Sequence, residues 1–255
     1  MAINETYFYG QGKLYSRLKG VSGAWRWWGD VSALTFGGTD EKVSHKESYS
    51  GQKASVRSFS IGGDRTLSGT IHQIDVDSLA ELLRGDVSTI AGGSVSAELL
   101  PADLVAGDVV KLDKPYNVSD LVIVDSTGTP VTLDPENYDL EAPFGSIQML
   151  TIPGGAMQPF KAAYEYLGGR QVSFFSRTPK DIELRYEGIN LAEGGAPIIA
   201  EFYRVSSAPL QQLALITSGN DVAGTEFSAE ALLDSSKPVS GPLGRFGRYV
   251  QITEA

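Results

Sequence analysis

Short runs of β-branched and aromatic residues, separated by glycine and proline, constrain the fold of this 255-residue chain most strongly. The runs alternate in part between apolar and polar side chains, which is typical of strands with one buried face. The 29 glycines and 12 prolines supply the turns between them. The pattern predicts a mainly β fold, a sandwich or a barrel. The expected strands are residues 31–36, 56–61, 67–74, 172–175, 182–186 and 198–205.

A single short helix is predicted beside this sheet. Residues 79–84 contain good helix formers, Asp77 or Ser78 can cap their amino end, and Gly85 follows where a left-handed residue is favoured. A weaker helical pattern covers residues 229–233. We therefore expect one flanking α-helix, and we treat the second pattern as a lesser candidate.

Acidic side chains are concentrated in the middle of the chain. Residues 96–169 carry eleven acidic and three basic side chains, whereas residues 1–95 carry ten of each and residues 170–255 carry eight basic and ten acidic ones. This step in composition, bordered by glycine-rich stretches, predicts a small all-β module inserted into a discontinuous domain formed by residues 1–95 and 170–255. A long acidic loop is the alternative. The strands expected in the module are residues 109–112, 121–124, 131–133 and 161–166.

Composition and motifs argue against catalysis, cofactors and a membrane location. The chain has no cysteine and two histidines, its net charge is -10, and it contains no long apolar run. His72 lies near Asp75 and Asp77, but a regular strand would point His72 and Asp75 to opposite faces, so we interpret this stretch as a strand end followed by a helix cap. Residues 9–13 lack the remaining elements of a phosphate loop and are interpreted as a flexible segment.

All three tryptophans lie within four residues, at Trp25, Trp27 and Trp28. Aromatic rings beside Arg26 can stack on bases or sugars. Trp27 and Trp28 face opposite ways on a strand, so at least one is expected in the core or in an interface. Packing or contact with another subunit is the favoured interpretation.

The segment from residue 36 to residue 59 is unusually long and polar for a connection between two strands. Its charges alternate in sign and it contains few aliphatic residues. We expect it to be either a disordered tip or a segment that becomes ordered against another chain. The residues proposed to stack on a neighbouring subunit are Thr39, Asp40, Glu41, Lys42, Lys46, Glu47, Ser48, Tyr49, Ser50 and Gly51.

The order of these features resembles the tail tube (major tail) proteins of long-tailed bacteriophages. The resemblance comprises an N-terminal arm, the strand at 31–36, the polar motifs at 38–41 and 47–51, the helix ending at Gly85 and the late strand 182–190. Residues 136–140 and 145–147 of the insert also resemble β modules of such proteins. The resemblance covers roughly 170 residues of the two flanks.

The resemblance implies a non-enzymatic virion protein that forms hexameric rings stacked into a hollow tube through which double-stranded DNA passes. The implied partners are further copies of the chain and the tape-measure, tail terminator and tail-tip proteins of the same virion. The protein would be made in the host bacterial cytoplasm and reside in the virion tail. The negative charge concentrated in residues 96–169 separately predicts that the acidic module lies on the outside of the tube, where repulsion between six copies is smaller. A different virion β-protein, from the tail tip or a head decoration, and a carbohydrate-binding β module remain the alternatives.

Overall fold

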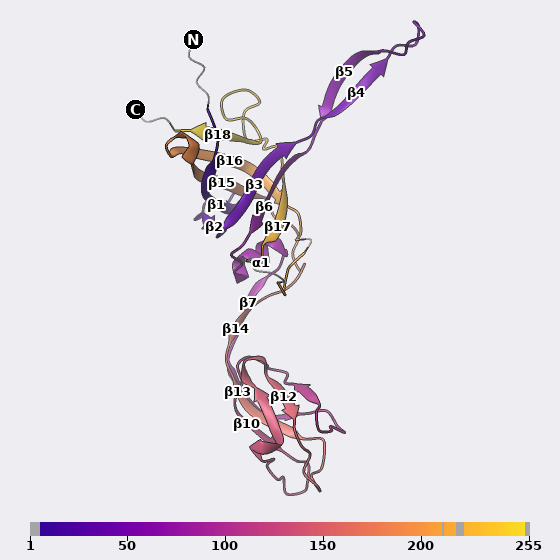
Figure 1. Cartoon of the computed structure of the whole chain (residues 1–255), viewed down its shortest axis with the longest axis vertical. Coiled ribbons are helices and arrows are strands. Elements are labelled where there is room, and N and C mark those ends of the chain that lie inside the picture. The colour runs from indigo at the N-terminus through magenta and orange to yellow at the C-terminus, as the bar shows by residue number, and fades with distance from the viewer. Residues whose placement is uncertain (1–5, 211, 218–221, 253–255) are drawn as a thin grey trace. The chain divides into compact units, whose positions relative to one another are not determined.

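A computed structural model describes residues 6–210, 212–217 and 222–252. The chain forms two compact units (Figure 1). Met1–Asp86 and Val172–Ala255 together make the parent unit, and Val87–Gln171 make the inserted unit. The insert therefore begins earlier than residue 96, where the first cluster of acidic residues suggested a boundary.

One antiparallel sheet of eight strands forms the parent unit. The long strand β16 pairs with β15 on one side and, on the other, with β18 along its first half and with β17 at its end. The mainly β prediction is confirmed. The strands, in sheet order, are β2 (Arg26–Trp27), β1 (Gly10–Leu18), β15 (Ile182–Asn190), β16 (Ala196–Ser207), β17 (Thr225–Ala231), β6 (Arg65–Ile71) and β3 (Val31–Gly38), with β18 (Gly247–Gln251) beside β16.

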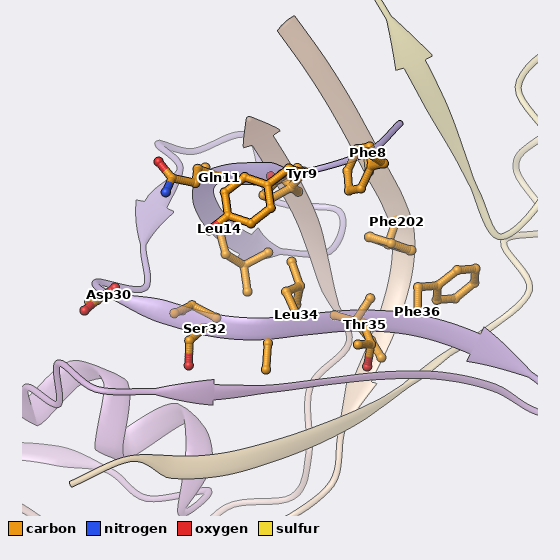
Figure 2. A pocket seen from close by; sticks show the side chains of 17 residues that line it. Phe8, Tyr9, Gln11, Leu14, Asp30, Ser32, Leu34, Thr35, Phe36 and Phe202 are labelled. Atoms are coloured by element: carbon orange, nitrogen blue, oxygen red, sulfur yellow. The ribbon is translucent and has the colours of Figure 1, made fainter. Parts of the chain in front are cut away.

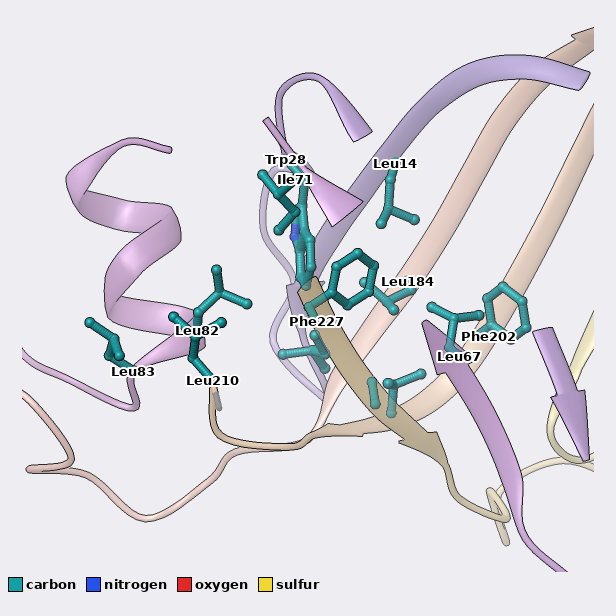
Figure 3. Packing of buried hydrophobic residues seen from close by; sticks show 13 residues of the cluster. Leu14, Trp28, Leu67, Ile71, Leu82, Leu83, Leu184, Phe202, Leu210 and Phe227 are labelled. Atoms are coloured by element: carbon teal, nitrogen blue, oxygen red, sulfur yellow. The ribbon is translucent and has the colours of Figure 1, made fainter. Parts of the chain in front are cut away.

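The sheet is strongly curved, so that strands far apart in its order share one concave face. Phe36 on β3 and Phe202 on β16 lie three strand steps apart, which is about 14 Å in a flat sheet, yet their ring centroids are 4.9 Å apart. The core fills this concave face (Figure 3). Its buried residues are Leu14, Trp28, Leu67, Ile71, Leu82, Leu83, Ile182, Leu184, Phe202, Val205, Leu210, Phe227 and Ala229.

The weaker helical candidate at 229–233 is wrong. Most of it lies in β17, in which Thr225, Phe227, Ala229 and Ala231 are buried while the residues between them are exposed. A period of two belongs to a half-buried strand, and pairing with β6 and β16 outweighs the helical propensity of alanine and glutamate.

The predicted short helix is confirmed as α1 (Val76–Leu82), although it starts before the expected cap. Asp75 is the N-cap, because its carboxylate accepts a hydrogen bond from the backbone N–H of Ser78 at 2.6 Å. Arg84 takes the left-handed conformation (φ 49°), and the Gly85 N–H donates to the Ala80 carbonyl at 2.8 Å. Among the described residues, no helix is long and apolar enough to cross a membrane.

Gly85 is required for a different reason from the one predicted. A Cβ at this position would lie 1.8 Å from the carbonyl oxygen of Ser173, so only glycine permits the close approach of the two chain segments. Gly12 has the same role on β1, where a Cβ would lie 2.4 Å from the Glu187 carbonyl oxygen. The interpretation of residues 9–13 as a flexible segment is therefore wrong, because Gly10–Leu18 pair along their whole length with β15.

The inserted unit has its own core between two three-stranded sheets. Two of the expected strands differ from the observed ones. In the strand expected at 131–133, Thr132 forms only an isolated bridge with Val124, and of the strand expected at 172–175 only Val172 lies in a strand. The sheets are β10 (Ser119–Val124), β13 (Lys161–Tyr166) and β8 (Gly93–Leu99), and β11 (Tyr138–Glu141), β12 (Ser146–Met149) and β9 (Val109–Lys111). A separate ribbon pairs β7 (Val87–Ile90) with β14 (Gly169–Val172), and the 3-10 turns are Pro135–Asn137, Ala142–Phe144 and, in the parent unit, Leu191–Glu193.

Candidate interaction surfaces

The long polar segment is a β-hairpin that stands outside the main sheet. Strands β4 (Glu41–Lys46) and β5 (Ser55–Gly62) pair with each other and, among the described residues, with no other strand. Figure 1 shows them continuing β3 and β6 beyond the end of the parent sheet. Every residue of both strands is exposed. An isolated two-stranded hairpin is only marginally stable in water, so this one lacks the packing partner that such a ribbon needs.

Apolar side chains on the hairpin are more prominent than the sequence suggested. Val43 and Phe59 lie directly opposite each other in the register, where side chains share a face, and they are 43% and 52% exposed. Val56 and Ile61 are also exposed. These side chains give the hairpin an unburied apolar component of the kind that interfaces cover.

Glu47 organises the tip of the hairpin. Its carboxylate accepts hydrogen bonds from the Ser50 hydroxyl, from the Ser50 N–H at 2.8 Å and from the Tyr49 N–H at 3.1 Å. The Glu47 N–H donates to the Ala54 carbonyl at 2.9 Å, which closes the turn. The hydrogen bond from the Ser50 side chain, followed by the one from its backbone, lowers the pKa of Glu47 below its ordinary value. Tyr49 is 85% exposed on this turn.

The base of the hairpin is held by Arg65. Its guanidinium donates to the Thr39 carbonyl at 2.8 Å and pairs with the Asp40 carboxylate at 2.6 Å. Gly63 permits the close approach of the two chain segments at the base, because a Cβ at this position would lie 1.9 Å from the Thr39 carbonyl oxygen. The predicted residues are thus distributed along the hairpin: Thr39 and Asp40 at its base, Glu41, Lys42 and Lys46 on β4, and Glu47, Ser48, Tyr49, Ser50 and Gly51 at its tip.

The three tryptophans do not form one surface. Trp28 is 2% exposed, packs edge to face against Phe227 with centroids 5.0 Å apart, and donates from Nε1 to the Ser16 hydroxyl at 2.7 Å. Trp28 is therefore a core residue and not part of a contact surface, so the prediction that it contacts another subunit is wrong. Trp27 is exposed beneath Lys13, and the Arg17 guanidinium lies over the ring of Trp25 at 4.5 Å.

A second surface, which the sequence analysis missed, lies between β1 and β3. These strands border a cavity of about 730 Å³, and β3 is an edge strand with no partner on its outer side among the described strands. Figure 2 shows Phe8, Tyr9 and Leu14 facing β3 across this cavity, with Phe202 near Phe36. We call this cavity the β1–β3 groove. The exposed Tyr7-Phe8-Tyr9 run was the available signal for it.

Hydrogen bonds hold the arm that leads into the groove. Asn190, which is 3% exposed, accepts from the Tyr9 N–H at 2.8 Å and donates to the Tyr7 carbonyl at 2.8 Å. The Leu191 N–H donates to the Tyr9 carbonyl at 2.9 Å. The aromatic side chains of Phe8 and Tyr9 are therefore presented from an ordered backbone although they are largely exposed.

Acidic partners neutralise several arginines of the parent unit. Glu201 bridges Arg185 and Arg248 at 2.6 and 2.5 Å across neighbouring strands. Arg177 lies 3.4 Å from Asp86, and Arg65 pairs with Asp40 as described. The positive charge of these arginines is locally balanced, which limits their use in holding a polyanion.

The sequence candidates for metal or acid-base chemistry have structural contacts. Asp75 caps α1, His72 Nε2 lies 2.8 Å from the Ser32 hydroxyl, and His45 is exposed on β4 opposite Arg57. In the part of the chain that the structure describes, no group of three His, Asp or Glu residues is placed to hold a metal ion.

The fold and these surfaces define a mainly β protein of two units with an exposed hairpin and an apolar groove. Residues 7–250 match the model of a family described as "Protein of unknown function UCP028589", and the chain belongs to that family. No curated protein matches the sequence.

Proposed function

We propose that the protein is a non-catalytic structural subunit that assembles with copies of itself into stacked hexameric rings, forming the hollow tail tube of a long-tailed bacteriophage. The observation that carries the proposal is the β4–β5 hairpin, which is exposed at every strand residue and pairs with no other described strand. A ribbon of this kind gains its stability from a partner, and the apolar pair Val43 and Phe59 gives a partner something to bury.

Two unlike surfaces on one chain favour head-to-tail assembly. The hairpin and the β1–β3 groove differ in shape and lie on different strands, so a contact between them joins copies heterologously. Heterologous contacts form rings when the rotation closes and open filaments when it does not. One closing and one open contact would generate stacked rings.

A tube that conducts double-stranded DNA must not retain it. Arg65, Arg177, Arg185 and Arg248 are each paired with an acidic side chain, and the whole chain carries a net charge of -10. Few phosphates would be neutralised by such a surface. An electrophoretic mobility shift at low salt is expected to show no tight binding of double-stranded DNA, and salt-sensitive binding by subunits or tubes would contradict the conduit role.

The proposal places the inserted unit on the tube exterior and the protein in the virion tail, after synthesis in the bacterial cytoplasm. Its further partners are the tape-measure, tail terminator and tail-tip proteins. Separation of the inserted unit's core from the parent core is compatible with a peripheral role.

Sedimentation velocity over a range of protein concentrations tests self-assembly. We expect a concentration-dependent shift from monomer to large particles. A matched variant, Val43→Ser with Phe59→Ser, retains the hairpin sequence elsewhere and is expected to shift only at higher concentration. A chain that remains monomeric at all concentrations contradicts the proposal and favours a monomeric carbohydrate-binding module.

A further inference from the structure

We propose that Tyr49 is the anchor of the contact between two copies of this chain, and that it inserts into the β1–β3 groove of the second copy. The inference rests on the proposed self-assembly and deepens it by naming the anchoring residue and the surface that receives it. Both surfaces are described above, and neither is occupied by another part of the described chain.

The tip is built to present one aromatic side chain. Glu47 is 5% exposed and holds the backbone N–H groups of Tyr49 and Ser50, while Gly51 adopts the left-handed conformation (φ 79°) that lets the chain turn back. These hydrogen bonds within one chain favour the turn conformation that presents Tyr49, which lowers the entropic cost of binding. Tyrosine suits such a position, because it has two rotatable bonds, a large apolar ring and a hydroxyl.

The groove has the chemistry to receive an aromatic side chain. It is lined by Phe8, Tyr9, Leu34, Phe36 and Phe202, and its volume of about 730 Å³ accommodates a tyrosine ring together with part of its turn. Aromatic rings pack edge to face or offset, so a groove walled by Phe and Tyr stabilises an inserted ring beyond simple burial.

Charge also favours a contact between copies. The hairpin carries Lys42, Lys46, Lys53 and Arg57 against Glu41 and Glu47, a formal charge of +2 in a chain of -10. Asp30 is the charged residue in the groove lining. A hairpin of net positive charge that approaches an acidic molecule with an acidic group at the groove is electrostatically complementary.

The absence of cysteine from the chain allows a direct test by disulfide cross-linking. Ser48→Cys places a thiol beside Tyr49 without removing it, and Gln11→Cys places one in the groove lining. The two variants, one carrying a size tag, are mixed and oxidised. We expect a mixed disulfide dimer on a non-reducing gel. Ser48→Cys mixed with Ser22→Cys, which is exposed outside the groove lining, is the matched control and is expected to give little product.

Substitutions at the tip give an independent measurement. Tyr49→Ala is expected to raise the dissociation constant for self-association about 30-fold or more, because removal of a central aromatic anchor has effects of this size. Tyr49→Phe keeps the ring and is expected to stay within a few-fold of wild type. Glu47→Gln retains an acceptor oxygen and is expected to weaken association less than Glu47→Ala. Ser48→Ala is the control at the neighbouring exposed position.

The outcomes separate this inference from the proposed function. If wild-type protein assembles, but Tyr49→Ala assembles equally well or Ser48→Cys cross-links no better to Gln11→Cys than to Ser22→Cys, the anchor assignment is overturned while self-assembly stands. If wild-type protein never associates, both fail.

Discussion

Removing the hairpin is expected to abolish assembly without unfolding the parent unit. The variant replaces residues 40–63 with Asn-Gly, a pair that favours the tight turn of a two-residue hairpin. Thr39 and Asp64 already join β3 to β6, since the Thr39 N–H donates to the Asp64 carbonyl at 3.0 Å. The two-residue loop therefore connects β3 and β6 in the register that they already have in the sheet.

The expected stability change follows from what the hairpin contacts within its own chain. Its strand residues are all exposed, and the deletion removes the ion pair between Arg65 and Asp40, in which both side chains are partly exposed. Such a pair contributes about 0–1 kcal/mol, so the free energy of unfolding should change by less than about 1 kcal/mol. Urea denaturation measures this change, and sedimentation velocity of the same variant measures assembly.

Two results would refute the reasoning. A loss of several kcal/mol, seen as a large drop in the urea midpoint at unchanged slope, would mean that the hairpin packs on the parent unit. Full assembly by the shortened protein would mean that the hairpin is not the contact between copies.

Three further predictions concern the core, an ion pair and the insert. Trp28→Phe loses the hydrogen bond to the buried Ser16 hydroxyl and leaves space beside Phe227, so it should lower the free energy of unfolding by about 2–4 kcal/mol. The control Trp27→Phe should change it by less than about 0.5 kcal/mol. Equal effects of the two variants in urea denaturation would be inconsistent with the packing. Burial alone would raise the pKa of Asp234, but hydrogen bonds from Lys19 and Ser236 outweigh burial and lower that pKa to about 2. The ionised carboxylate therefore stabilises the fold fully above pH 3.8, the ordinary pKa of Asp, and this stabilisation is lost as the pH falls from 3.8 toward 2. Lys19→Met should cost about 1 kcal/mol near neutral pH and reduce this acid-dependent loss, and an unchanged pH profile of thermal unfolding would argue against the pair. Joining Asp86 to Ser173 through Asn-Gly removes the insert at a point where the Ser173 N–H already donates to the Asp86 carbonyl at 3.1 Å. The shortened chain should fold and assemble. Folding without assembly would mean that the insert takes part in the contact between copies.

Local chemistry made several elements predictable. The helix followed from its capping residues and Gly85, although Asp75 rather than Asp77 or Ser78 is the N-cap, accepting from the Ser78 N–H. The opposite orientations of Trp27 and Trp28 followed from strand geometry, and Trp28 is indeed in the core.

Features that depend on nonlocal pairing were not predictable in the same way. The strand expected at 56–61 is present as β5, but β4 was not predicted, because it has no buried face and lacks the alternation by which strands are recognised. The boundary of the insert was placed too late because residues 87–95 carry no charged side chain, although β7 and β8 begin there. The β1–β3 groove forms only when a curved sheet brings two distant strands together, and no local motif encodes that curvature.

Negative-stain electron microscopy of the purified wild-type protein tests the central claim most directly. We expect hollow tubes of constant diameter and variable length, built from rings with sixfold symmetry, and no tubes for the variant without its hairpin. Dispersed monomers, or closed particles that do not stack at any concentration, would contradict it.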